Sequence, residues 1–212
     1  MKARCHQLLP FIFLLLVVLS RWPGLMPVNF SAVYALVFCA GAFFPHRLTW
    51  RAPFAVLLLT DLALNAYYQF GRGYAVFTPG GLLYLACNYG GYGALWWLGR
   101  RFRYTRNLLG LLGGGMLGAI IFYLVTNTAA WLLNPFRNPE YTKTLAGWLI
   151  ALTSGTKGWP QTWEFFRNTL LSGGLFTALF GAAWTLTTAE SPAEKGEPQG
   201  EEAEPKPEEA QA

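Results

Sequence analysis

One acidic side chain interrupts an apolar stretch of this 212-residue chain, and it is the first candidate for chemistry. Asp61 lies in the run LLLTDLALNAYY, and Asn65 and Tyr68 follow it at i+4 and i+7. In a helix these three side chains share one face, so we expect that face to point into the protein. An ionisable group inside an apolar segment is costly and indicates function. Two interpretations stay open: a structural hydrogen-bond hub, or a contact with a polar solute or a cation.

A second candidate pair opens the last apolar segment. Arg167 and Asn168 follow two phenylalanines there. A long cationic side chain at such a position reaches either toward lipid headgroups or toward a charge partner. In the second case the partner is Asp61 or an anionic ligand.

A third group combines amides with an indole ring. Asn127, Trp131 and Asn134 stand at i, i+4 and i+7, and Asn88 adds an amide from the preceding apolar segment. Amides and aromatic rings on one face are typical of a pocket for an uncharged planar or heterocyclic molecule. The alternative is hydrogen bonding between helices.

The usual signatures of enzymes and metal sites are absent from the sequence. There is no GxxxxGK[ST], HExxH or GxSxG motif, and no nucleophile and base stand together. The three cysteines are isolated, and His6 and His46 are the only histidines. We therefore expect no catalytic residue, no metal, no cofactor and no enzymatic activity.

The elements that must position these residues are apolar helices. Hydrophobic residues make up 53% of the chain and charged residues 13%, whereas soluble domains carry about 25% charge. A membrane-crossing helix needs about 20 mostly apolar residues. Six segments approach this pattern, which predicts an all-α, polytopic membrane protein with six transmembrane helices: 7–22, 29–45, 51–70, 79–99, one within 107–133, and 164–187.

Basic residues near the segment ends orient the predicted bundle. They concentrate on the side of the N-terminus, most densely in RRFRYTR at 100–106, which favours both termini in the cytoplasm of a bacterial inner membrane. Three aromatic-rich loops then converge on the outer face, and the longest carries a short amphipathic helix near 140–153. Arg21 falls in the first of these loops. The loops are 21–30, 70–80 and 134–163.

The chain divides into two parts by composition. Residues 1–188 form the predicted transmembrane domain. Residues 189–212 hold eight of the eleven acidic residues and no aromatic residue, which predicts a disordered acidic cytoplasmic tail. A basic, apolar body of this kind favours the lipid bilayer as partner and not nucleic acid.

Small residues recur at intervals of four in three predicted helices. Such stripes allow backbones to approach closely in lipid. They serve either packing within the bundle or docking on a membrane partner. The three stripes are Ala86, Gly90 and Ala94; Gly110, Gly114 and Gly118; and Gly173, Thr177 and Gly181.

Several stretches together resemble a family of uncharacterised bacterial six-helix membrane proteins. The resemblance covers most of residues 8–185 and rests on PVNFSAVYALVFCAGAFF, LLLTDLALNAYY, FYLVTNTAAWLLNP and FFRNTLLSGGLFTALFG. The family pattern includes Asn29 with Phe30, Asp61, Thr126 with Asn127, and the run from Phe166 to Thr169. Gly174 departs from it, because a polar or acidic residue is expected there.

More distantly, the layout resembles the substrate-capturing S components of energy-coupling factor (ECF) transporters. That resemblance implies outer loops that close over a vitamin-sized ligand, and docking on a transmembrane coupling subunit driven by ATPases. The first helix here lacks the small residues with which many S components dock.

We therefore expect a solute-binding subunit for uptake of a small molecule such as a vitamin or heterocycle. Two alternatives stay open: a structural scaffold without transport activity, and a membrane enzyme acting on lipid. The residues expected to line the substrate site are Asn29, Asp61, Asn65, Tyr68, Asn127, Trp131, Arg167 and Asn168.

Overall fold

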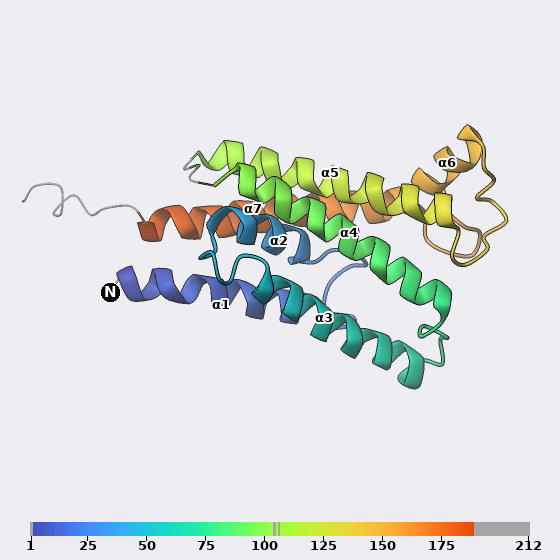
Figure 1. Cartoon of the computed structure of the whole chain (residues 1–212), viewed down its shortest axis with the longest axis horizontal. Helices are drawn as coiled ribbons and strands as arrows, with labels where there is room; N and C mark the ends of the chain where they lie inside the picture. The colour runs from blue at the N-terminus through green and yellow to red at the C-terminus, as the bar shows by residue number, and fades with distance from the viewer. Residues whose placement is uncertain (1, 104, 106, 189–212) are drawn as a thin grey trace, which may run out of the picture.

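The computed structural model describes residues 2–103, 105 and 107–188, and this part of the chain is helical, without strands (Figure 1). The predicted acidic tail, 189–212, lies outside the described residues. Seven α-helices and one π-helix follow one another: α1 (Lys2–Ser20), α2 (Val33–Phe43), α3 (Arg51–Ala66), η1 (Tyr67–Gly71), α4 (Pro79–Arg101), α5 (Leu108–Leu133), α6 (Leu145–Leu152) and α7 (Thr162–Thr188). The all-α fold class is confirmed, and α6 lies within the segment expected to hold a short helix.

The helices form an elongated bundle around the short helix α2. Ten residues of α2 are buried, from Val33 to Ala42, and α2 contacts α1, α3, α4, α5 and α7. A helix that is apolar on every face has this central place because it has no face to expose. The N-terminal end of α1 and the last turn of α7 lie at one end of the bundle, and α6 lies at the other (Figure 1). We call these the terminal end and the α6 end.

Two helices, not six, are long and apolar enough to cross a membrane within the described part of the chain. They are Leu108–Leu133 and Thr162–Thr188. The apolar parts of α1 and α2 are shorter, Gln7–Ser20 and Val33–Phe43. Several glycines and an asparagine lower the mean hydropathy of α4, and α3 ends after 16 residues. The predicted segments do form helices, but the expected number of full-length apolar spans is wrong.

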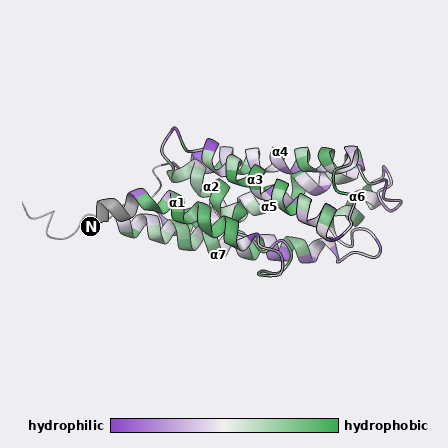
Figure 2. Cartoon of the chain, turned by 90° about the horizontal axis from the view of Figure 1, so that it is seen from below, coloured by the Kyte–Doolittle hydropathy of each residue, from purple (hydrophilic) through white to green (hydrophobic). Residues whose placement is uncertain are grey.

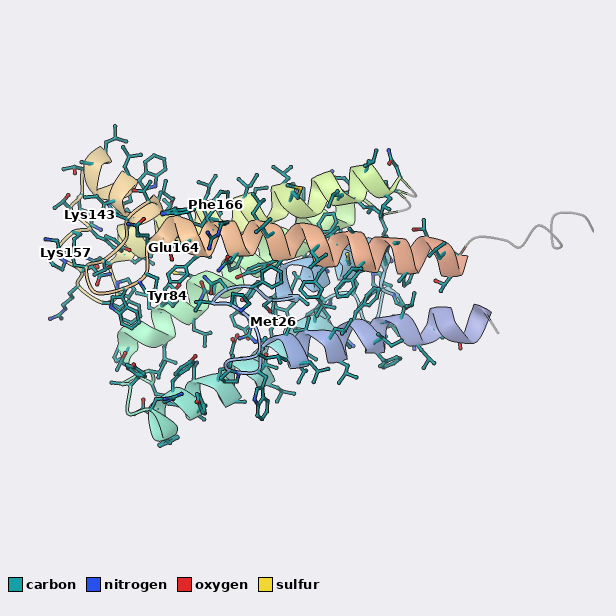
Figure 3. The ribbon with its side chains drawn as sticks, turned by 180° about the vertical axis from the view of Figure 1, so that it is seen from behind. Met26, Tyr84, Lys143, Lys157, Glu164 and Phe166 are labelled. Atoms are coloured by element: carbon teal, nitrogen blue, oxygen red, sulfur yellow. The ribbon has the colours of Figure 1, made fainter. Side chains whose placement is uncertain are left out.

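The connection between α1 and α2 lies part-way along the bundle and not at its α6 end; most of its residues are exposed, and we call it the internal connection for its position along the axis. Arg21, which directly follows α1, is paired with Asp61 on α3. The Nδ2 group of Asn168 on α7 donates to the carbonyl of Val28 in the same connection at 2.9 Å. Met26 accordingly lies nearer the middle of the bundle than Lys143, at the α6 end (Figure 3). The expectation that 21–30 is a loop at the outer face is corrected: α1 is too short to reach that end.

Ser20 fixes this internal connection. Its buried hydroxyl accepts from the backbone N–H of Ala32 at 3.1 Å and donates to the carbonyl of Val17 at 2.9 Å. It thereby joins the last turn of α1 to the start of α2.

We predict that Ser20→Ala lowers the free energy of unfolding by about 1–3 kcal/mol, because the buried N–H of Ala32 loses its acceptor. Unfolding of the purified protein in mixed micelles, followed by tryptophan fluorescence, measures the change. Ser154→Ala is the matched control, since Ser154 is exposed. Equal stability of the two variants would contradict this role.

The three stripes of small residues take different places. Those on α5 and α7 pack inside the bundle, and their buried members are Gly114, Gly118, Gly173, Thr177 and Gly181. On α4, Ala86 and Gly90 are exposed, and a Cβ atom at Gly90 would meet no atom within 4 Å. Two stripes therefore serve internal packing, and the α4 stripe faces outward.

Candidate functional site

Arg21 and Asp61 form a buried ion pair, in which Nη2 of Arg21 donates to Oδ1 of Asp61. Each side chain is only 12% exposed. Charges removed from water require a partner, so the pair explains how Asp61 is accommodated inside the bundle. Arg167, the charge partner that the sequence suggested, is exposed, and its guanidinium lies over the ring of Trp163 at 5.4 Å. The pairing of Arg167 with Asp61, one of the alternatives that the sequence left open, is therefore wrong.

Three tyrosines surround this ion pair. Tyr89 on α4 lies within electrostatic range of Asp61, and Tyr92 on the same helix lies within range of both charges. Tyr34 on α2 is close to Arg21. Because side chains from three helices and the internal connection meet here, the site is screened from water, and its electrostatic interactions are stronger than at a surface. We call Arg21, Tyr34, Asp61, Tyr89 and Tyr92 the polar cluster.

Aromatic rings pack around the polar cluster. The ring of Phe122 on α5 stacks on Tyr92, with centroids 4.9 Å apart, and meets Tyr34 edge-on at 5.1 Å. Tyr89 contacts Tyr92 at 5.8 Å. The rings of Tyr34, Tyr92 and Phe122 are buried against one another, and these stacked and edge contacts add to the energy of burial.

Three atoms of the polar cluster are buried without a hydrogen bond of good geometry to any described residue. They are Nε of Arg21, Oδ2 of Asp61 and the hydroxyl oxygen of Tyr89. Most buried polar atoms in folded proteins are paired, so three unsatisfied ones in one place call for an explanation. They comprise one donor, one acceptor and one hydroxyl that can act as either.

The polar cluster lies near the middle of the bundle's length. Asp61 is about ten residues before Gly71, the last residue of η1, which corresponds to ~15 Å along the axis. Tyr92 is about 13 residues after Pro79, the first residue of α4, or ~20 Å. Both distances are measured from the α6 end. Because Arg21 is paired with Asp61, the connection that carries Arg21 lies at the same depth.

A cavity of about 270 Å³ lies between this connection and η1, and Tyr68 is one of the residues that line it. Short π-helical turns often occur at functional sites. Here Nε of Arg72 donates to the Tyr67 hydroxyl at 3.0 Å, and this hydrogen bond raises the pKa of the guanidinium above its ordinary value. Tyr68 is 40% exposed and lines the cavity, whereas Asp61 and Asn65 on the same helix face are not among its lining residues. The lining residues are Pro23, Gly24, Tyr67, Tyr68, Arg72 and Tyr74.

The amide and indole group of α5 is bound to nearby backbone. Nδ2 of Asn127 donates to the carbonyl of Tyr123 in the same helix at 2.9 Å. Nε1 of Trp131 donates to the carbonyl of Thr142 at 2.6 Å. Lys143 donates to the last carbonyls of α5 and lies over the Trp131 ring at 5.4 Å. This arrangement stabilises the end of α5, where carbonyl groups lack helical partners.

The remaining predicted residues occupy separate places. Asn29 is exposed and has a positive φ of 59° in the internal connection. Asn65 is half-buried, one turn beyond Asp61 on α3. Asn168 holds the internal connection through Val28. The structure thus brings Asp61 into the polar cluster and Tyr68 into the neighbouring cavity, whereas Asn127, Trp131 and Arg167 make local contacts elsewhere.

Arg21 and the three tyrosines of the polar cluster were missed from the sequence. Arg21 directly follows an apolar run and precedes Trp22-Pro23-Gly24, which indicated a surface turn. The available signal was the shortness of that run: about 14 apolar residues span only ~21 Å. A turn after so short a helix would lie part-way along a bundle of longer helices and not at its end.

Comparison with known proteins places this chain in a family. The model of a family of unknown function (DUF6580) matches residues 1–194. The chain belongs to this family. Searches of curated proteins and of solved structures found no match. The predicted resemblance to an uncharacterised family is confirmed, and the DUF6580 match extends beyond residues 8–185 at both ends.

Proposed function

We propose that this DUF6580 protein is a membrane-embedded, solute-binding protein that takes up a small molecule from the side of its α6 end. The observation that carries the proposal is the buried ion pair of the polar cluster, with its unsatisfied donor, acceptor and hydroxyl. Intramembrane ionisable residues commonly mark solute or ion pathways. Substrate sites of transporters commonly lie near the bilayer midplane, at a depth similar to that of the polar cluster.

The apolar outer surface of the helices supports a membrane location. Leu171, Leu175 and Leu179 on α7 stand at intervals of four and are 56%, 48% and 53% exposed. Phe11 and Leu15 on α1 are 59% and 58% exposed. Contiguous exposed apolar surface is rare on soluble monomers and is compatible with lipid. Hydrophobic residues run along the helices, and hydrophilic ones gather in the connecting segments (Figure 2).

In this proposal all six predicted segments lie within the bilayer as one bundle, with α2 shielded from lipid by its neighbours. The basic residues Arg100, Arg101 and Arg103 lie at the terminal end, which favours that end as the cytoplasmic side of a bacterial inner membrane. The α6 end then faces outward, and the solute reaches the polar cluster from there.

The chemistry of the polar cluster defines the class of solute. Oδ2 of Asp61 requires a donor, Nε of Arg21 requires an acceptor, and the Tyr89 hydroxyl accepts either. The stacked rings of Tyr92 and Phe122 border the polar cluster, and such a border is compatible with a flat solute. A vitamin-sized heterocycle with donor and acceptor groups on its edge satisfies all of these requirements.

Uptake in this proposal follows the layout of ECF S components. The bundle tilts or rocks as a whole after binding the solute, and other chains supply a coupling subunit and ATP hydrolysis. The outward-facing small residues of α4, including Ala86 and Gly90, offer the close-approach surface that such a subunit would need.

The experiment is to purify the protein in mild detergent and to identify co-purifying small molecules by mass spectrometry. We expect one heterocyclic compound at a stoichiometric level. Tyr89→Phe should lower the affinity for it about tenfold, because one hydrogen bond of about 1–1.5 kcal/mol is lost. The variant should remain close to the wild type in stability, since this hydroxyl makes no hydrogen bond of good geometry within the described chain.

Tyr141→Phe is the matched control. This substitution also removes a tyrosine hydroxyl, but from a half-buried residue outside the polar cluster. We therefore expect the Tyr141→Phe variant to retain the compound. Equal retention by both variants would reject the polar cluster as the binding site. A protein free of small molecules that instead co-purifies with other membrane proteins would favour a scaffold.

A further inference from the structure

A second and larger cavity lies at the terminal end of the bundle, far from the polar cluster. Its volume is about 540 Å³, and α2, α5, α7 and the segment between α4 and α5 enclose it. One wall is apolar: the Phe43 and Trp184 rings stack with centroids 5.0 Å apart, and Leu111 lies on the α5 side. A cavity of this volume accommodates a small molecule or part of a lipid chain.

The cavity lining also includes a cationic side chain and two hydroxyl groups. Arg103 lines it, and one Nη of its guanidinium donates to the carbonyl of Phe44 at 3.5 Å. A guanidinium has five N–H donors, so those not used in this contact can bind an anion. Thr185 and Thr188 line the cavity as well, and because their hydroxyls donate to carbonyls of α7, they add polarity while Arg103 supplies the donors for an anion.

Further arginines and tryptophans surround this end of the bundle. The guanidinium of Arg100 lies over the ring of Trp96 at 5.2 Å, and that of Arg101 lies over Trp97 at 4.6 Å. Trp97 is 55% exposed. Tryptophan and arginine side chains at this level are typical of the boundary between the acyl chains and the headgroups of a bilayer. An apolar cavity with a cationic rim at that boundary matches a lipid that has an anionic headgroup.

We propose that this cavity binds one anionic phospholipid, with its phosphate at Arg103 and an acyl chain along Phe43, Leu111 and Trp184. The proposal rests on the membrane location proposed above but not on solute binding. An anionic lipid fits better than a soluble anion because most of the cavity wall is apolar. It also fits better than a zwitterionic lipid because the rim carries cationic charge, and no acidic side chain of the described residues lines the cavity.

The test compares the melting temperature of the full chain in mild detergent with added phosphatidylglycerol or phosphatidylcholine, followed by tryptophan fluorescence. We expect phosphatidylglycerol to raise the melting temperature by about 4 °C more than phosphatidylcholine does. Arg103→Gln should abolish this difference, and Arg103→Lys should keep part of it because the charge remains. Native mass spectrometry should show one retained phosphatidylglycerol on the wild type and none on Arg103→Gln.

Arg47→Gln is the matched control, because it removes the same charge from an exposed site in the connection between α2 and α3, outside the cavity. Equal loss of the lipid preference in Arg47→Gln and Arg103→Gln would overturn the proposal in favour of a general surface effect. An equal stabilisation by inorganic phosphate would overturn it in favour of a soluble anion. A third possible occupant of the cavity is the acidic tail of the chain, and a variant with its eight glutamates changed to glutamine tests this. If phosphatidylglycerol stabilised only that variant, the tail would be the occupant, and the proposal would be overturned.

Discussion

Replacing Asp61 with leucine should lower the free energy of unfolding by about 3 kcal/mol, and replacing Arg21 with methionine should have a similar effect. Each single change leaves the opposite charge buried without a partner, and truncation of one member of a buried pair costs about 3–5 kcal/mol. Both side chains are 12% exposed, so water compensates little. The measurement is the midpoint of unfolding in mixed micelles with increasing sodium dodecyl sulfate.

The double variant Arg21→Met/Asp61→Leu should regain most of that stability, because two apolar side chains of similar size fill the space without an unpaired charge. Arg167→Met provides the matched control, since Arg167 is exposed and its guanidinium lies over the face of Trp163. It should change stability by less than about 1 kcal/mol. Single variants as stable as the wild type would contradict the burial of the pair.

The double variant also separates the two interpretations of Asp61. If the ion pair is only a structural hub, the double variant folds and retains the co-purifying solute. If the pair binds the solute, the double variant folds but loses the solute, because neither the carboxylate nor the guanidinium remains. We expect the second result, since Oδ2 of Asp61 and Nε of Arg21 have no hydrogen bond of good geometry in the described chain.

Local sequence patterns predicted the helices well because those patterns act within a single segment. Long apolar runs gave α5 and α7 with boundaries within a few residues, and Thr144 caps the predicted short helix, its hydroxyl accepting from the backbone N–H of Gly147. The burial of Asp61 followed from its apolar surroundings, since a lone carboxylate in such a run must face inward.

Depth within the bundle could not be predicted in this way. The Arg21–Asp61 pair joins residues 40 positions apart, and hydropathy contains no information about which charge meets which. The turn at Pro23 and Gly24 was predicted correctly as a turn, but its depth depends on how far α1 extends beside longer neighbours. The face of Tyr89 and Tyr92 that meets the pair likewise depends on how α4 is rotated against α2.

The same limit applies to the small-residue stripes, and the contact between α2 and α4 illustrates it. Periodicity singled out Ala86 and Gly90, which are exposed. The residues that bring α2 and α4 together are Gly41 and Gly99: a Cβ atom at Gly41 would meet the carbonyl of Trp96, and one at Gly99 would meet the carbonyl of Phe38. Two glycines on facing helices allow backbone-to-backbone approach, which is the main source of helix association where apolar burial contributes little.

Gly99→Ala should therefore lower the free energy of unfolding by about 2–3 kcal/mol, although alanine is the better helix former. The added methyl group meets backbone atoms of Phe38, which cannot rotate away as a side chain could, so α2 and α4 must separate. The matched control is Gly90→Ala in the same helix, where the methyl group meets no atom within 4 Å. That variant should gain up to about 1 kcal/mol from helix propensity. Unfolding midpoints of the two variants, measured together, should thus move in opposite directions, and movement in the same direction would contradict the close contact between α2 and α4.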